Sequence, residues 1–276
     1  MSISISNIAW NRDEDTAVAE LLARHGVRWI DVAPSKYFPI PSKADDRDVA
    51  EVKQWWASRG VSIAGMQALL FGTQGLNMFG PSDVQLRMLD HLTHIFRIAA
   101  GLGATKLVFG SPKNRDRGDL PSKQAQDMAA AFFHRAGDFA RAEGVILCLE
   151  PNPERYGANF MVNTDETAAV VRMTSHTHVR MQWDTGAIFI NGEDPAALLA
   201  RHGDLIGHVH LSEPDLAPLG SAGSDHAAMA AALQHQVAGP LTIEMLRPES
   251  GLPHIEDALR FSLTHYVATA NGATAQ

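Results

Sequence analysis

Four short apolar runs in the C-terminal half of the chain each end on a side chain that can bind a metal ion. The runs span residues 145–150, 179–184, 205–210 and 241–244, and their last residues are Glu150, Asp184, His210 and Glu244. One carboxylate at a strand end is often only the N-cap of the next helix, but four such endings in succession need another explanation. If the strands are parallel neighbours, the four side chains share one mouth. There the carboxylates would repel one another unless a divalent cation lay among them.

Three carboxylates and one imidazole form a hard, oxygen-rich ligand set. Such a set suits Mn²⁺ best, with Mg²⁺, Co²⁺ and Zn²⁺ as alternatives. A carbonyl compound bound to the cation through its carbonyl oxygen and an adjacent hydroxyl would have its neighbouring C–H bond acidified, because the cation stabilises the enediolate. Glu150 and Glu244 end strands that lie about three apart, so they can face each other across a substrate and act as acid and base.

Strand-like and helix-like segments alternate along the whole chain. We expect the other strands at 3–9, 27–32, 61–70 and 105–110, and helices ending near residues 25, 59, 101, 143, 176, 202, 236 and 268. About eight strand–helix units imply a parallel sheet and favour an α/β fold of the closed (β/α)₈ TIM-barrel type, in which strand ends line the active site. The alternative is an open doubly wound sheet, but residues 9–12 lack its glycine fingerprint. We therefore expect one domain over residues 1–276, with 270–276 a frayed tail.

The sequences around the four candidate ligands resemble those of the xylose-isomerase-like TIM-barrel superfamily of sugar isomerases and epimerases. The motifs are LEPN at 149–152, WDTG at 183–186, GHVHLSE at 207–213 and IEM at 243–245, and the four ligands are 34, 26 and 34 residues apart. This resembles the mononuclear metal site of the ketose 3-epimerases. The resemblance implies a sugar isomerase or epimerase in which one of Glu150 and Glu244 removes a proton from C3 and the other returns it on the opposite face. In an isomerisation, one carboxylate would move the proton between C1 and C2.

One position departs from this family pattern. Family epimerases and the endonuclease IV branch usually carry a histidine about three residues after the aspartate, where this chain has Ala187. The endonuclease branch also needs histidines at earlier strand ends, where this chain has Gln67 and Gly110. A trinuclear DNA-repair site is therefore not expected, and the net charge of −8 also argues against a nucleic-acid partner.

Six further side chains are candidates for holding the substrate near the expected mouth. They are Gln67, Lys113, His208, Glu213, His226 and Arg247. Lys113 has a solvated charged loop as its alternative reading. His208 shares the strand face of His210 and could instead fill the barrel.

Other activities would use the same residues. A metal-dependent dehydratase, similar to inosose dehydratase, would begin with the same proton abstraction and then eliminate hydroxide. An endonuclease IV-type enzyme and a catalytically inactive binding module are more remote alternatives. The metal ligands alone do not separate an epimerase from a dehydratase.

Composition predicts a globular cytoplasmic protein. Hydrophobic residues make up 45% of the chain and charged residues 20%. The single cysteine, Cys148, lies in an apolar strand and leaves no disulfide framework, which suits a reducing compartment. No stretch reaches the roughly 18 apolar residues of a membrane span. We expect a small sugar as ligand, no nucleic-acid or membrane partner, and, from the resemblance, a homodimer or homotetramer.

Overall fold

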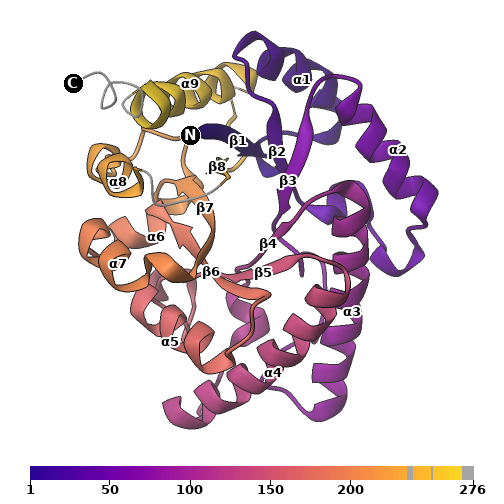
Figure 1. The fold of residues 1–276 in the computed structure, drawn as a ribbon, viewed down its shortest axis with the longest axis vertical. Helices are drawn as coiled ribbons and strands as arrows, with labels where there is room; N and C mark the ends of the chain where they lie inside the picture. The colour runs from indigo at the N-terminus through magenta and orange to yellow at the C-terminus, as the bar shows by residue number, and fades with distance from the viewer. Residues whose placement is uncertain (235–238, 250, 269–276) are drawn as a thin grey trace.

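A closed barrel of eight parallel strands forms the centre of the protein (Figure 1). The structure is a computed structural model, and it describes residues 1–234, 239–249 and 251–268. The strands, in chain order and in barrel order, are β1 (Ser2–Ser6), β2 (Trp29–Val32), β3 (Ser62–Met66), β4 (Lys106–Phe109), β5 (Ile146–Leu149), β6 (Val179–Asp184), β7 (Ile206–Ser212) and β8 (Pro240–Glu244). β1 pairs with β8 and closes the barrel, so the (β/α)₈ prediction is confirmed.

Helices surround the strands and cover their outer face (Figure 1). They are α1 (Asp15–Arg24), α2 (Asp46–Ala57), α3 (Ser82–Leu102), α4 (Ser122–Ala142), α5 (Thr164–Thr174), α6 (Thr185–Ile190), α7 (Pro195–His202), α8 (His226–Leu233) and α9 (Leu252–Ser262), which continues into a π-helical segment, Leu263–Ala268. Most strand side chains are buried and apolar, but β1 alternates serine with isoleucine, and β6 and β7 also carry buried polar side chains. No helix in the described part of the chain combines the length and the apolar character that a membrane crossing needs.

Side chains at the helix starts explain why the helices begin where they do. Asp45 accepts a hydrogen bond from the Asp48 backbone at 2.8 Å, and Asn163 accepts one from Glu166 at 2.8 Å. Asp194 and Asp225 cap α7 and α8 in the same way. Each such cap is worth about 1 kcal/mol of helix stability.

Three segments differ from the sequence-based expectations. β3 ends at Met66 rather than at residue 70, because Ala68 adopts a left-handed backbone with φ of 54° and turns the chain across the barrel mouth. β1 ends at Ser6 and is followed by a 3₁₀ turn, Asn7–Ala9. The short helix α6 was not expected. The predicted end of a helix near residue 236 and the predicted frayed tail at 270–276 lie outside the described residues.

Candidate metal centre and the barrel mouth

The four predicted ligands lie together at the C-terminal ends of adjacent strands. Glu150 follows β5, Asp184 ends β6, His210 lies in β7 and Glu244 ends β8. One ligand atom from each lies within 4.8 Å of the others, and all four side chains are buried. His210 Nδ1 is 3.3 Å from Glu150 Oε1 and 3.2 Å from Glu244 Oε2. The two glutamates therefore approach the same imidazole nitrogen.

Hydrogen bonds orient the carboxylates of Asp184 and Glu244. The Ser212 hydroxyl lies 3.0 and 2.9 Å from the two oxygens of Asp184 and donates to that carboxylate. The backbone N–H of Ala187 donates to Asp184 Oδ1 at 2.6 Å, so Asp184 also caps α6. Gln67 Nε2 donates to Glu244 Oε1 at 2.6 Å.

Glu150 is oriented by neighbours from two other segments. Asn152 Nδ2 donates to Glu150 Oε2 at 3.2 Å. A Cβ atom at Gly110 would lie 1.9 Å from the same oxygen, so a side chain at this position would displace the carboxylate. The buried Arg115 donates from Nη1 to the Glu150 carbonyl oxygen at 2.7 Å. The position of Glu150 therefore depends on the chain after β4 as well as on β5.

Burial and mutual repulsion of the carboxylates shift the pKa values of this group of side chains. Burial raises the pKa of Asp184 to about 8, with a further contribution from the negative charges of Glu150 and Glu244. Burial alone would lower the pKa of His210, but the charges of Glu244 and Glu150 outweigh it and raise this pKa well above its usual value. A divalent cation would neutralise the clustered negative charge, and the donor set of three carboxylates and one imidazole matches a hard metal ion.

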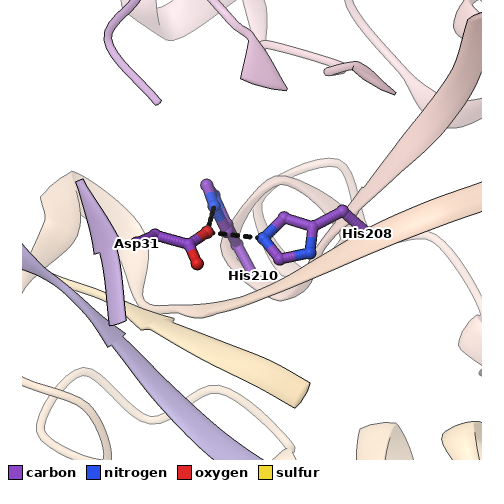
Figure 2. Close-up of side chains that lie close together, drawn as sticks. All are labelled: Asp31, His208 and His210. Atoms are coloured by element: carbon purple, nitrogen blue, oxygen red, sulfur yellow. Dashed lines mark hydrogen bonds and ion pairs between the residues drawn. The ribbon is translucent and has the colours of Figure 1, made fainter. Parts of the chain in front are cut away.

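Asp31 lies on the opposite side of His210 and was missed in the sequence. Its Oδ2 atom is 2.6 Å from His208 Nε2 and 4.0 Å from His210 Nε2, and Figure 2 shows both contacts as dashed lines. All three side chains are buried, and they also form a group that could hold a metal ion. A distance of 4.0 Å is too long for a hydrogen bond, so Asp31 acts on the His210 ring through its negative charge. Asp31 lies one residue before the end of β2, and a carboxylate within the apolar run at 27–32 was the signal that could have identified it.

Two cavities, each of about 480 Å³, open at the mouth beside the glutamates. Glu150, Glu244, Gly110 and Leu216 line both. We call the cavity that also contacts Asp184 and Ser212 the metal-side cavity, and the one that extends to Gln67, Leu70 and Lys113 the far cavity.

Left-handed backbone conformations occur in the walls of both cavities. Ala68, Asp215 and Leu216 have φ values of 54°, 59° and 52°. Such conformations in residues other than glycine cost on the order of 1–3 kcal/mol each and persist only where surrounding contacts hold them. Strained backbone conformations of this kind are often found at binding sites.

The structure places three of the six predicted substrate contacts in a cavity wall. Gln67 and Lys113 line the far cavity, and Glu213 lines the metal-side cavity. However, the Glu213 carboxylate accepts hydrogen bonds from Gly220 and Ser224 in the loop that follows β7. Glu213 thus holds that loop.

The other three lie away from the cavity walls. His208 bonds to Asp31 beneath the candidate metal centre. His226 is buried, with Nε2 3.0 Å from Glu213 Oε1 and Nδ1 2.6 Å from the Tyr266 hydroxyl oxygen, so both ring nitrogens are engaged within the protein. Arg247 forms a two-pronged ion pair with Glu14, at 2.8 and 3.0 Å. These three residues were predicted at the mouth because they lie in or after strands of the second half. In the structure, hydrogen bonds and ion pairs with other parts of the chain hold them outside the two cavity walls.

Comparison with solved structures supports the fold. A D-psicose 3-epimerase from Clostridium cellulolyticum H10, crystallised with D-tagatose, has a TM-score of 0.79 and 17% identity, covering 96% of this chain and 99% of that one. A 3-keto-D-glucoside 4-epimerase from E. coli has a TM-score of 0.78 and 17% identity, with the same coverage. At this level of identity the likeness concerns the fold alone.

Comparison by sequence gives the family. A curated L-ribulose 3-epimerase from Methylomonas sp. (strain DH-1) is 28% identical over 139 residues, which is 50% of this chain and 48% of that protein. The matched segment therefore spans about half the length of this relative. A family model described as a xylose isomerase-like TIM barrel matches residues 19–265. Because that match spans most of the chain, the protein belongs to the xylose isomerase-like TIM barrel family.

Proposed function

We propose that the protein is a divalent-metal-dependent sugar epimerase or isomerase that acts on a ketose or a sugar derivative. The observation that carries this proposal is the convergence of Glu150, Asp184, His210 and Glu244 in one buried group beside two cavities. The names of the sequence relative and of the structural neighbours, which are sugar epimerases, support it.

The proposed metal ligands are the four converging side chains, with Mn²⁺ as the preferred ion. A divalent cation held there would supply positive charge that stabilises the negative charge developing on the substrate's carbonyl oxygen. Ser212 keeps the Asp184 carboxylate in place for this role. Asp31 places a buried negative charge 4.0 Å from His210 Nε2 and forms its hydrogen bond with His208. The group of Asp31, His208 and His210 in Figure 2 shares only His210 with the four proposed metal ligands. We propose that the group of four binds the metal ion and that Asp31 and His208 support it from the other side of His210.

Glu150 and Glu244 are the proposed acid and base. Both carboxylates line both cavities, and we propose that the substrate binds between them where the two cavities meet. One takes a proton from the carbon next to the carbonyl group, and the other returns a proton to the opposite face. Proton transfer by a positioned side chain typically accelerates a reaction by about 10²- to 10⁴-fold. Hydrogen bonds from Gln67 and Asn152 hold the two carboxylates at the substrate during these transfers.

The proposed site lacks the histidine that epimerases of this family usually carry near residue 187, where this chain has Ala187. Ala187 lines the metal-side cavity, and its small side chain leaves room there. Asn152 and Tyr156 line the same cavity and carry polar groups. We propose that Asn152 binds the substrate oxygen that such a histidine would otherwise hold.

Solvent exchange tests this proposal. The Mn²⁺-loaded protein is incubated with five- and six-carbon ketoses in D₂O, and deuterium in the sugar is measured by NMR. We expect metal-dependent exchange at the carbon next to the carbonyl group, with formation of an epimer or isomer. Loss of water with a new enone absorbance would instead indicate a dehydratase.

Variants assign the exchange to the two glutamates. Glu150→Gln and Glu244→Gln should each reduce exchange by about 10²-fold or more, because each loses a proton-transferring group. Glu154→Gln, at an exposed position on the same loop as Glu150, is the matched control and should exchange like the wild type. Undiminished exchange in both active-site variants would refute the proposed roles.

A further inference from the structure

The loop that follows β7, residues 213–225, forms part of both cavity walls, and we call it the β7 loop. Asp215 lines the metal-side cavity, and Leu216 lines both cavities. Their φ values of 59° and 52° are unfavourable, above all for leucine, so contacts elsewhere must hold this backbone. An ion pair joins Arg155 to Asp215 at 2.8 Å, but it is exposed, and exposed pairs contribute little. The main anchor of the loop is therefore expected inside the protein.

A buried carboxylate at the start of the β7 loop gathers the rest of the loop around it. Glu213 Oε1 accepts a hydrogen bond from the Gly220 N–H at 2.9 Å. Glu213 Oε2 accepts from the Ser224 hydroxyl at 2.5 Å and from the Ser224 N–H at 3.3 Å. Burial raises the pKa of the Glu213 carboxyl, but hydrogen bonds from His226 and Ser224 outweigh it and lower this pKa. The carboxylate is therefore ionised and only accepts, so His226 Nε2, 3.0 Å from Oε1, carries a hydrogen.

The other ring nitrogen of His226 joins this anchor to the π-helical segment after α9. His226 Nδ1 lies 2.6 Å from the Tyr266 hydroxyl oxygen, and burial raises the pKa of that hydroxyl, which therefore stays protonated. His226 and Tyr266 are 3% and 1% exposed, so water does not compete for these bonds. The segment that contains Tyr266 also packs against α8, which begins at His226 (Figure 1). His226 thus connects two parts of the chain that are 40 residues apart.

Apolar packing supports the same connection. The Phe261 ring in α9 lies edge-to-face against the His226 ring, with the centroids 5.1 Å apart. Gly220 comes so close to Phe261 that an added Cβ atom would lie 2.6 Å from its ring. The β7 loop is therefore pressed against α9 as well as bonded to its extension.

The candidate metal centre is held independently of the β7 loop. Ser212, which orients Asp184, is the last residue of β7. Its N–H donates to the Thr185 hydroxyl at 2.8 Å, and its carbonyl oxygen accepts from the same hydroxyl at 2.8 Å. These bonds fix the end of the strand before the loop begins. A change within the loop should therefore reach the cavity walls while the four proposed metal ligands stay in place.

We propose that His226 is a positioning residue, which keeps Asp215 and Leu216 in the cavity walls by tying Glu213 to Tyr266. This inference rests on the proposed function, because the walls matter for a reaction only if the cavities hold its substrate. His226 itself lines neither cavity, so it acts through Glu213 and the β7 loop. Its loss should weaken substrate binding more than proton transfer, and should leave metal binding unchanged.

His226→Phe tests the role, because it keeps a ring but removes both hydrogen bonds. The assay is deuterium exchange by the Mn²⁺-loaded protein into D-fructose or D-ribulose. We expect KM to rise about tenfold or more, since a lost hydrogen bond to a buried charged group has effects of this size. The value of kcat should change less than about threefold, and calorimetry should give an unchanged Mn²⁺ affinity. An unchanged KM, or a loss of Mn²⁺ affinity, would overturn the inference.

Two further variants separate positioning from a general loss of structure. His226→Gln keeps a donor for Glu213 and should return KM to within about threefold of the wild type. His94→Phe, on α3, is the matched control and should behave like the wild type, because α3 contributes no residue to either cavity wall. A KM in His226→Gln as high as that in His226→Phe would count against the hydrogen bonds as the cause.

Tyr266→Phe tests the far end of the connection and keeps the shape of the side chain. It removes one hydroxyl and leaves the bond between His226 and Glu213, so KM should rise less than in His226→Phe, by about threefold. The double variant should have the same KM as His226→Phe, because both changes break one chain of bonds. This variant also carries the test if His226→Phe does not fold. An unchanged KM in Tyr266→Phe would show that Tyr266 has no part in positioning the loop.

Amide hydrogen exchange, measured without any sugar, separates this inference from the proposed function. In the wild type, peptides covering residues 213–225 should exchange slowly, because Glu213 binds the N–H groups of Gly220 and Ser224. In His226→Phe they should exchange about tenfold faster, while peptides from β7 do not change. Faster exchange without turnover of any sugar would support the anchor and refute the proposed reaction. Unchanged exchange of the loop would overturn the inference whatever the activity.

Discussion

In the half of the barrel from β5 to β8, each strand brings one side chain to the candidate metal centre, whereas among the described residues of the half from β1 to β4 none joins that group of four. The first half instead contributes neighbours: Gln67 bonds to Glu244, Gly110 leaves space for Glu150, and Asp31 contacts His210. It also provides much of the apolar wall of the far cavity. Strand–helix units of the second half thus provide the proposed metal ligands and proton-transferring groups. Those of the first half hold these side chains in position and form part of the cavity wall. Substitutions in the first half should therefore change activity or metal affinity by displacing or altering the ligand side chains of the second half.

Gly110→Ala should have the largest effect of these substitutions. The added Cβ would lie 1.9 Å from Glu150 Oε2, so the carboxylate must move while the fold remains. We expect solvent exchange to fall by about 10²-fold, because a displacement of about 1 Å at a reacting group can cost that much. Gly203→Ala is the control, since its added Cβ has 3.7 Å of space to the nearest heavy atom. An active Gly110→Ala variant would mean that Glu150 does not need its present position.

Asp31→Asn should weaken metal binding without removing any of the four proposed ligands. Loss of the carboxylate removes the partner of His208 and the negative charge beside His210 Nε2. The loss of Mn²⁺ affinity should be smaller than the 10- to 100-fold that is typical of a direct hydrogen-bond partner of a metal-ligating histidine, because Asp31 acts on His210 only through its charge. Calorimetric titration with Mn²⁺ measures this effect, with the exposed Asp119→Asn as control. An unchanged Mn²⁺ affinity would show that the charge of Asp31 has no influence on metal binding by His210.

The metal-free protein should lose stability as the pH rises from about 4 to 8. Asp184 keeps its proton in the folded state up to a pKa of about 8, and His210 also has a raised pKa, so at these two groups the folded state binds more protons than the unfolded state. Each extra proton corresponds to about 1.4 kcal/mol of unfolding free energy per pH unit. Urea unfolding of the chelator-treated protein at several pH values measures the slope. Asp184→Asn should flatten it, and stability that rises over this range would contradict the charge balance described above.

Lys113→Ala should have the smallest effect. Lys113 is exposed at the rim of the far cavity. We expect less than about a threefold change in kcat/KM for a neutral ketose, since exposed charges contribute little. A loss of more than tenfold would instead show that the far cavity binds an anion.

The barrel and the convergence of the four side chains were accessible from the sequence. Alternation of apolar runs with capped helices indicated a parallel barrel, and strand ends in such a barrel share one mouth. That rule brought Glu150, Asp184, His210 and Glu244 together before any coordinates. Their roles, and the choice of Mn²⁺, stay predictions.

The supporting residues were not accessible in the same way. Asp31 lies inside a strand, and its role depends on which barrel-interior side chains meet across strands that are far apart in the sequence. The contact of Gly110 with Glu150 is equally non-local. His226 and Arg247 follow strand ends, as the rule requires, but Tyr266 and Glu14 engage them. Strand order predicts which residues lie at the same end of the barrel. Which of their side chains form hydrogen bonds with one another depends on packing, which the sequence pattern does not show.

Anomalous diffraction at the manganese edge, from crystals grown with Mn²⁺, tests the central claim most directly. The account predicts one strong peak among Glu150, Asp184, His210 and Glu244. A peak among Asp31, His208 and His210 instead, or no peak at either group in crystals saturated with the ion, would contradict it.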